Sequence, residues 1–231
     1  MSSSNGISVT LLCDEDIPTC FKILSESFGH DAPFVDSYFP NHDTLPGQVQ
    51  GANRLSAWKR TTPESVFLKA VTSADGEATE KERIVGLAIW THMKDIPSEE
   101  LEAVEKAHEV WPDVNDRRFM ARLWRDYVQP RTRAIRDSRG RGVYVLELLA
   151  IHPDYQGLGA GTALVTWGTK AADELRVTAV VESTPAGRRV YEKCGLRADI
   201  EEMVFDANGE FADRAKPKLI FMMREPVTEH N

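Results

Sequence analysis

Apolar positions along the chain alternate between two spacings, one typical of strands and one typical of helices. Alternating apolar residues at 7–11 predict a first strand, and a helix with a single apolar stripe follows at 14–28. Two runs at 66–72 and 84–92 predict a hairpin with its turn at 73–78. Strands that alternate with helices in this way are typical of an α/β protein.

A strand, a glycine turn and a helix follow one another in the second half of the chain. The apolar run at 143–151 is rich in strand-forming residues, and Pro153 interrupts it. The turn at 156–162 comes next, and apolar residues then recur at helical spacing as far as Leu175. The first N–H groups of a helix have no internal partner, and the helix dipole makes that end electropositive. We therefore expect residues 156–162 to bind a pyrophosphate.

The spacing of the glycines separates the possible nucleotide-binding motifs. A dinucleotide turn, G-x-G-x-x-G, fails because Thr162 or Leu164 stands where the third glycine belongs. A Walker loop fails because no lysine follows Gly161. The remaining pattern is Q-x-x-G-x-G, filled by Gln156, Gly159 and Gly161, and it resembles the acetyl-CoA signature of the GNAT superfamily of N-acetyltransferases.

A second motif strengthens this resemblance. A β-branched strand at 177–182 leads to Thr184-Pro and a short helix that ends Tyr191-Glu-Lys-Cys-Gly195-Leu. This is similar to the later GNAT motif, a strand and a helix ending Y-E-K-x-G-[FL]. Thr184 departs from the asparagine that the family often has there, which keeps a helix cap but leaves any amide contact to the cofactor open.

The resemblance implies a GNAT-like α/β (α+β) fold. We expect a mixed, mostly antiparallel central sheet of six to seven strands flanked by helices, with the last strands at 196–205 and 218–223. One N-acetyltransferase domain should span 1–231, with a polar tail at 1–6 and an acetyl-CoA-binding core at 142–196.

Residues 97–141 predict a helical insertion between the third and fourth strands. Its nine arginines are interspersed with aspartates, which favours a solvated, ion-paired helix face. The alternative is a lid over the acceptor groove, or a site for the 3′-phosphate of the cofactor.

Composition limits the compartment and the partners. The 231 residues carry a formal net charge of −8, which disfavours nucleic acid and suits a cationic small substrate. No apolar stretch is long enough to span a membrane. The three cysteines lack metal-binding spacing, so we expect reduced thiols, a cytoplasmic location and no metal. The protein is expected to be a monomer or homodimer.

The resemblance also implies which residues hold acetyl-CoA. The backbone of the central strand pairs with the pantetheine arm, and the N–H of Ile151 is the candidate donor to the thioester carbonyl. The expected cofactor-binding residues are Leu149, Ala150, Ile151, Gln156, Gly157, Leu158, Gly159, Ala160, Gly161, Thr162, Thr184 and Tyr191.

Three side chains are candidates for proton transfer. Tyr191 fills the tyrosine position of the family, and a phenol stays protonated at neutral pH and can deliver a proton to the leaving thiolate. Glu147 is a carboxylate on an otherwise apolar strand and shares, by alternation, the face of Leu149 and Ile151. Glu182, at the end of the next strand, is the other candidate base. For both glutamates an ion pair with a nearby arginine is the alternative.

The predicted function is transfer of an acetyl group from acetyl-CoA to a primary amine, by direct attack in a ternary complex with a small-molecule acceptor. A CoA-binding sensor without catalysis is one alternative. Acetylation of a protein or peptide lysine is the other.

Overall fold

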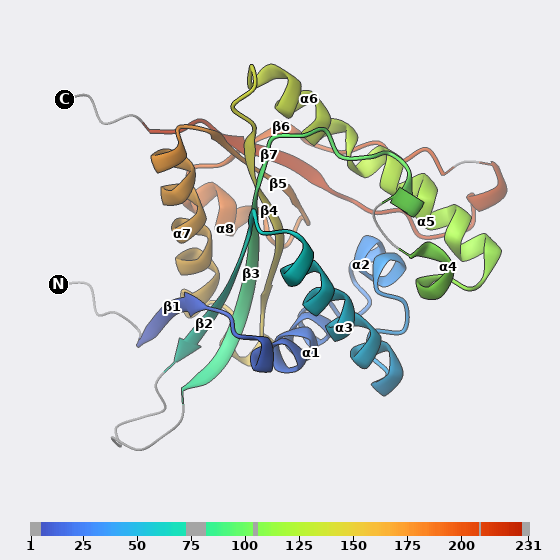
Figure 1. The fold of residues 1–231 in the computed structure, drawn as a ribbon, viewed down its shortest axis with the longest axis horizontal. Coiled ribbons are helices and arrows are strands. Elements are labelled where there is room, and N and C mark those ends of the chain that lie inside the picture. Colours follow the sequence, from blue (N-terminus) through green and yellow to red (C-terminus); the bar gives the residue numbers. More distant parts are fainter. Residues whose placement is uncertain (1–5, 73–81, 104–105, 208, 228–231) are drawn as a thin grey trace.

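A seven-stranded sheet organises the part of the chain that the computed structural model describes, residues 6–72, 82–103, 106–207 and 209–227. The strand order is β1-β2-β3-β4-β5-β7-β6 (Figure 1). β4 and β5 are parallel, and the other neighbouring pairs are antiparallel. The strands are β1 (Ile7–Leu11), β2 (Ser65–Thr72), β3 (Arg83–Met93), β4 (Val143–Ile151), β5 (Thr178–Ser183), β6 (Arg197–Ile200) and β7 (Ile220–Arg224).

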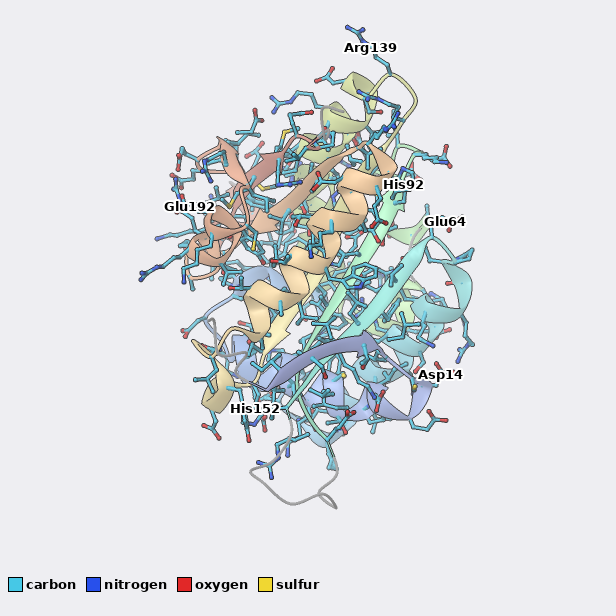
Figure 2. The ribbon with its side chains drawn as sticks, turned by 90° about the vertical axis from the view of Figure 1, so that its left-hand side faces the viewer. Asp14, Glu64, His92, Arg139, His152 and Glu192 are labelled. Atoms are coloured by element: carbon cyan, nitrogen blue, oxygen red, sulfur yellow. The ribbon has the colours of Figure 1, made fainter. Side chains whose placement is uncertain are left out.

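Helices cover both faces of the sheet. α7 (Ala160–Leu175) crosses one face, and Figure 2 shows it in front of the strands, beginning near His152 at one end of the sheet. Its buried residues pack with those of β2 to β5 in one core cluster. On the other face, α1 (Ile17–Phe28) and α3 (Leu45–Thr61) cover the half that contains β2 and β3. The predicted α/β fold is confirmed.

The segment between β3 and β4 is helical, as predicted. It contains η2 (Leu101–Ala103), α4 (Ala107–Val110), α5 (Val114–Tyr127) and α6 (Gln129–Asp137). Residues of α5 and α6 pack with those of β4, β5 and β7. The insertion therefore covers β4, β5 and β7 on the same face of the sheet on which α1 and α3 cover β2 and β3.

Several boundaries differ from the sequence prediction. Residues 29–51, to which the sequence analysis assigns no element, contain α2 (Pro33–Tyr38) and the start of α3. The strand predicted at 196–205 ends at Ile200, and η4 (Gly209–Phe211) lies in the irregular segment that follows. The turn predicted at 73–78 lies outside the described residues.

The remaining short elements flank the main helices. η1 (Asp14–Asp16) precedes α1, η3 (Pro153–Tyr155) follows β4, and α8 (Arg188–Lys193) follows β5. None of the described helices is long and apolar enough to cross a membrane.

Candidate active site

The sheet opens between β4 and β5. The two strands pair only from Val143 to Leu146 on β4, although β4 continues to Ile151. Beyond Leu146 the β4 edge that faces β5 therefore has no partner strand. An unpaired strand edge presents N–H and C=O groups to which an extended ligand can add as another strand.

A β-bulge lies at the point where the strands part. Trp90 of β3 pairs with Leu146 and Ile89 pairs with Leu148, so Glu147 has no partner on β3. A bulge adds one residue to a strand, so the side chains that follow lie on the opposite face of the sheet from that expected by alternation. Leu149 consequently packs on the α7 side, while Glu147 binds a residue of α6 on the other side. The expectation that Glu147 shares the face of Leu149 and Ile151 is wrong, because simple alternation does not allow for the bulge.

Arg131 of α6 joins the two predicted bases. Its Nη1 donates to Glu147 Oε2 at 2.9 Å, and its Nε donates to Glu182 Oε1 at 3.0 Å. Its Nη2 donates to the Tyr127 hydroxyl at 3.0 Å. The Arg131 and Glu182 side chains are 1% and 0% exposed, and that of Glu147 is 12% exposed. We call these four residues the carboxylate–arginine cluster.

The charges of the cluster set the proton affinity of Glu147. Burial raises the pKa of the Glu147 carboxyl, Arg131 offsets part of that rise, and the negative charge of Glu182 adds to it. Two ionised carboxylates and one guanidinium together carry a net charge of −1. A carboxyl with a raised pKa and a place for a further cation suits proton transfer from an ammonium group.

One cleft of about 2480 Å³ contains the cluster, the open edge of β4 and the glycine turn. Pockets that bind one drug-sized ligand typically have volumes of about 300–1,000 Å³, so this cleft has room for two ligands. Eleven of the predicted site residues line it: Glu147, Leu149, Ile151, Gln156, Gly157, Gly159, Gly161, Thr162, Glu182, Thr184 and Tyr191.

Three predicted cofactor-binding residues do not line the cleft. Ala150 is buried on the side of α1 and α3, and Ala160 is buried in the cluster beneath α7. The Leu158 side chain lies at the surface, 46% exposed. Their side chains are not in a position to contact a ligand in the cleft, so any contribution comes from their backbone.

The glycine turn has the predicted geometry. Gly157 and Gly159 have φ values of +77° and +102°, which side-chain-bearing residues rarely adopt. A Cβ at either position would meet no atom within 4 Å, so the turn is open to a ligand. α7 begins directly after Gly159 and presents its first N–H groups there.

Tyr191 lies on α8 at the other wall of the cleft. It is 7% exposed, and no hydrogen bond to its hydroxyl occurs among the described residues. Burial raises the pKa of this phenol well above its usual range, so it stays protonated at neutral pH. Thr184 accepts from the N–H of Gly187 at 3.2 Å in the turn before α8. The predicted helix cap at Thr184 is wrong, because α8 begins at Arg188 with Gly187 as its N-cap and no side-chain cap.

An aromatic wall lines part of the cleft, and three of its residues come from the aromatic-rich segment after α1. Phe34 of α2 stacks on Tyr127 with ring centroids 4.2 Å apart, and Tyr38 stacks on Trp124 at 6.1 Å. The aromatic wall consists of Phe34, Tyr38, Phe39, Trp58, Trp124 and Tyr127.

Sequence comparison identifies the family of this protein. The sequence model of the Acetyltransferase (GNAT) family matches residues 74–196, more than half of the chain. The protein belongs to this family. As a GNAT acetyltransferase it is an acyltransferase of a family that uses acetyl-CoA. No curated protein matches its sequence.

Solved GNAT structures share the fold of this acetyltransferase. Arylalkylamine N-acetyltransferase 2 from Aedes aegypti aligns with a TM-score of 0.62 at 18% identity, over 95% of this chain and 98% of that one. The histone acetyltransferase HPA2 and related acetyltransferase from Corynebacterium glutamicum aligns with a TM-score of 0.59 at 18% identity, over 97% and 99%. The phosphinothricin acetyltransferase of Sinorhizobium meliloti, in complex with AcCoA, gives 0.53 at 12% identity, over 96% and 89%.

Sequence reasoning did not single out Arg131, which is one of the nine arginines of the insertion. Others among them form exposed ion pairs, such as Arg118 with Glu210 and Arg133 with Asp199, as predicted for a solvated helix face. Arg131 stands four residues after Tyr127 and four before Ile135, on the buried stripe. A basic residue on an apolar helical stripe is the signal that identifies it.

Proposed function

We propose that this GNAT acetyltransferase transfers the acetyl group of acetyl-CoA to the nitrogen of a small primary amine, by direct attack in a ternary complex. The carboxylate–arginine cluster carries the proposal. Its net charge of −1 lies in the cleft where β4 and β5 part, and the ammonium group of an acceptor would neutralise it. The net charge of −8 on the chain also favours the approach of a cation.

The aromatic wall supports an acceptor with an apolar body. Tyr127 belongs both to this wall and to the cluster, so the apolar surface and the negative charge adjoin. Aromatic faces attract cations and bury apolar groups. An amine on a short aryl or alkyl chain matches this combination better than an extended polar peptide does.

Acetyl-CoA fits the other half of the cleft. The open turn with Gly157 and Gly159 would hold the diphosphate on the first N–H groups of α7. Arg189 and Lys193 of α8 line the same cleft and supply positive charge for phosphate groups. The open edge of β4 would pair with the pantetheine arm, with the Ile151 N–H as donor to the thioester oxygen.

Proton transfers are assigned by the environment of each group. Glu147, with its raised pKa, accepts the proton of the ammonium group, and Glu182 holds Arg131 in place. The free amine then attacks the thioester carbon, and the bond to sulfur breaks. Tyr191 donates its proton to the departing thiolate, and the proton that the nitrogen loses as the amide forms restores the phenol.

A screen for acetyl-CoA-dependent release of free thiol tests this function. The panel contains arylalkylamines, polyamines, aminoglycosides, amino acids and a lysine peptide. For one skeleton it also contains the matched alcohol and the matched α-amino acid. We expect the arylalkylamine to be acetylated faster than the alcohol, because the cluster binds an ammonium, and faster than the amino acid, because its carboxylate is repelled.

Glu147→Gln serves as the matched variant, since it keeps the size of the side chain and removes its charge. Turnover should fall about 10²- to 10⁴-fold, which is typical for loss of a general base. Thiol release only with the lysine peptide would overturn the small-molecule assignment. Binding of acetyl-CoA without thiol release from any amine would indicate a non-catalytic module instead.

A further inference from the structure

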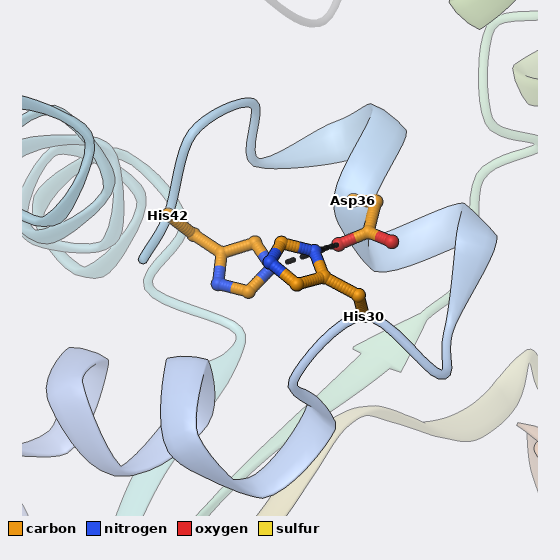
Figure 3. A group of neighbouring side chains, drawn as sticks. All are labelled: His30, Asp36 and His42. Carbon is orange, nitrogen blue, oxygen red and sulfur yellow. Dashed lines mark hydrogen bonds and ion pairs between the residues drawn. The ribbon is translucent and has the colours of Figure 1, made fainter. Parts of the chain in front are cut away.

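Between α1 and α3, outside the cleft, the imidazoles of His30 and His42 converge on one carboxylate oxygen of Asp36 (Figure 3). Asp36 Oδ1 lies 3.0 Å from His30 Nδ1 and 2.9 Å from His42 Nε2. One donor atom from each of the three residues lies within 4.8 Å of the other two. The His42 side chain is 1% exposed, whereas His30 and Asp36 open to solvent.

The tautomer of the neutral His42 ring follows from its contact with Ser25. The Ser25 hydroxyl donates its single proton to the His42 carbonyl at 2.9 Å. Its oxygen, 2.8 Å from His42 Nδ1, must therefore accept the Nδ1–H. In the neutral ring this leaves a lone pair on Nε2, directed at the Asp36 carboxylate oxygen. Two lone pairs at 2.9 Å repel each other, so a cation or a proton belongs between them.

His30 contacts the same carboxylate oxygen through one ring nitrogen. Nδ1 faces Asp36, and Nε2 lies 3.6 Å from Asp43 Oδ2. Histidines that bind metals usually donate their other ring N–H to a hydroxyl, carbonyl or carboxylate, which fixes the tautomer. Ser25 occupies this outer position for His42. Asp43 lies near His30 Nε2 but beyond hydrogen-bond distance, so it does not fix the tautomer of His30.

We propose that His30 Nδ1, His42 Nε2 and an oxygen of Asp36 bind one zinc ion, with water as the fourth ligand. Two imidazoles and a carboxylate are typical zinc ligands, at bond lengths of about 2.0–2.2 Å. Ligands on such bonds in a tetrahedron are about 3.3 Å apart, so small side-chain movements from the present spacing admit the ion. Asp36 and Asp43 supply the negative charge that a divalent cation requires.

The ion would fix the wall of the cleft. Asp36 lies on α2, which also carries Phe34 and Tyr38 of the aromatic wall. His42 lies close to the start of α3 and is tied to α1 through Ser25. A zinc ion here would link α1, α2 and the segment that leads into α3. The site is separate from the acetyl-transfer groups, and its occupancy does not depend on the proposed function.

Zinc titration of the full chain after treatment with a chelator tests the site. A competing chromogenic chelator gives the affinity, and thermal unfolding with and without zinc chloride gives an independent readout. We expect one zinc ion per chain and a rise in Tm on its addition. X-ray absorption should show two imidazole ligands at about 2.0–2.1 Å.

Variants identify the ligands. His30→Ala changes an exposed side chain and Asp36→Asn keeps the side-chain shape, and both should abolish stoichiometric binding and the rise in Tm. Ser25→Ala should weaken zinc about 10- to 100-fold, as loss of an outer hydrogen bond to a ligand does. The control His108→Ala removes a histidine whose side chain is 76% exposed on α4 and should leave the affinity unchanged.

Less than one zinc per chain in the wild type would overturn the proposal. So would equal affinity in the wild type and in His30→Ala or Asp36→Asn. Either result would leave His30, Asp36 and His42 as a hydrogen-bonded cluster without a metal ion.

Discussion

Replacing Arg131 by methionine tests the carboxylate–arginine cluster most sharply. Methionine fills much of the same volume, while the substitution removes the hydrogen bonds to Glu147, Glu182 and Tyr127. The two carboxylates would then lie in the protein interior without a positive partner. Removing one partner of a buried ion pair destabilises a protein by about 3–5 kcal/mol, because the remaining charge is uncompensated.

A domain of this size loses about 2–4 °C in Tm for each kcal/mol, so Arg131→Met should lower the Tm by on the order of 10 °C. Arg133→Met is the matched control. Arg133 lies on the same helix, pairs with Asp199 and has a side chain 55% exposed. Exposed pairs contribute about 0–1 kcal/mol, so the control should lose little stability.

The loss in Arg131→Met should also depend on pH. Arg131 holds down the pKa of Glu147, which burial raises above its ordinary value of 4.5, so the variant should raise it further. A carboxyl with a folded-state pKa above the unfolded value stabilises the fold at low pH, and that contribution is lost as the pH rises through the folded-state pKa. The stability difference between wild type and variant should therefore be largest at neutral pH and shrink towards pH values near 4.5.

Urea unfolding at several pH values, followed by tryptophan fluorescence, measures these free energies. A loss in Arg131→Met no larger than in Arg133→Met would refute the buried cluster. A loss that stays constant between neutral and acidic pH would refute the role of Glu147 protonation.

Other substitutions test separate parts of the account. In Glu147→Gln the pH–rate profile should lose its acidic limb, and a retained limb would assign the general base to another residue. The free energy of unfolding at neutral pH should not fall, since Arg131 keeps its ion pair with Glu182. Tyr191→Phe should lower kcat with little change in CoA affinity, and equal losses of both would remove this phenol from the acid role. Gly168→Ala should destabilise the fold by about 1–3 kcal/mol, because the added Cβ would lie 1.9 Å from the Trp90 ring and this clash outweighs the better helix propensity of alanine. An unchanged free energy of unfolding in urea would contradict the packing of α7 on β3.

The strand, turn and helix that we propose to bind the cofactor could be predicted from sequence because each carries a local signal. The turn around Gly159 needs positive φ values that only glycine adopts readily, and the helical stripe that follows is regular as far as Leu175. The tyrosine of the second motif lies in the cleft as expected. Local backbone chemistry and periodicity suffice for such features.

The acceptor half could not be predicted because its features depend on long-range contacts. The bulge at Glu147 arises from the pairing of β3 with β4, and no residue in either strand marks it. The ion pairs of Arg131 join a helix of the insertion to two strands, and sequence spacing does not show which of nine arginines reaches them. Outside the cleft, the convergence of His30 and His42 on Asp36 is local in sequence, six residues on either side, but depends on how α2 and its flanking loops fold.

Calorimetric titration of the full chain with acetyl-CoA tests the central claim, that the glycine turn and the open edge of β4 bind this thioester. Wild-type protein should bind one molecule per chain. Gly159→Ala places a side chain on a residue with a φ of +102°, so the turn should relax to another conformation in the free protein. Restoring the binding conformation then costs about 1–3 kcal/mol and should weaken binding about 5- to 150-fold. Circular dichroism should show the same helix content in both proteins. Absence of a binding heat in the wild type, or equal affinity in the two proteins, would contradict the account.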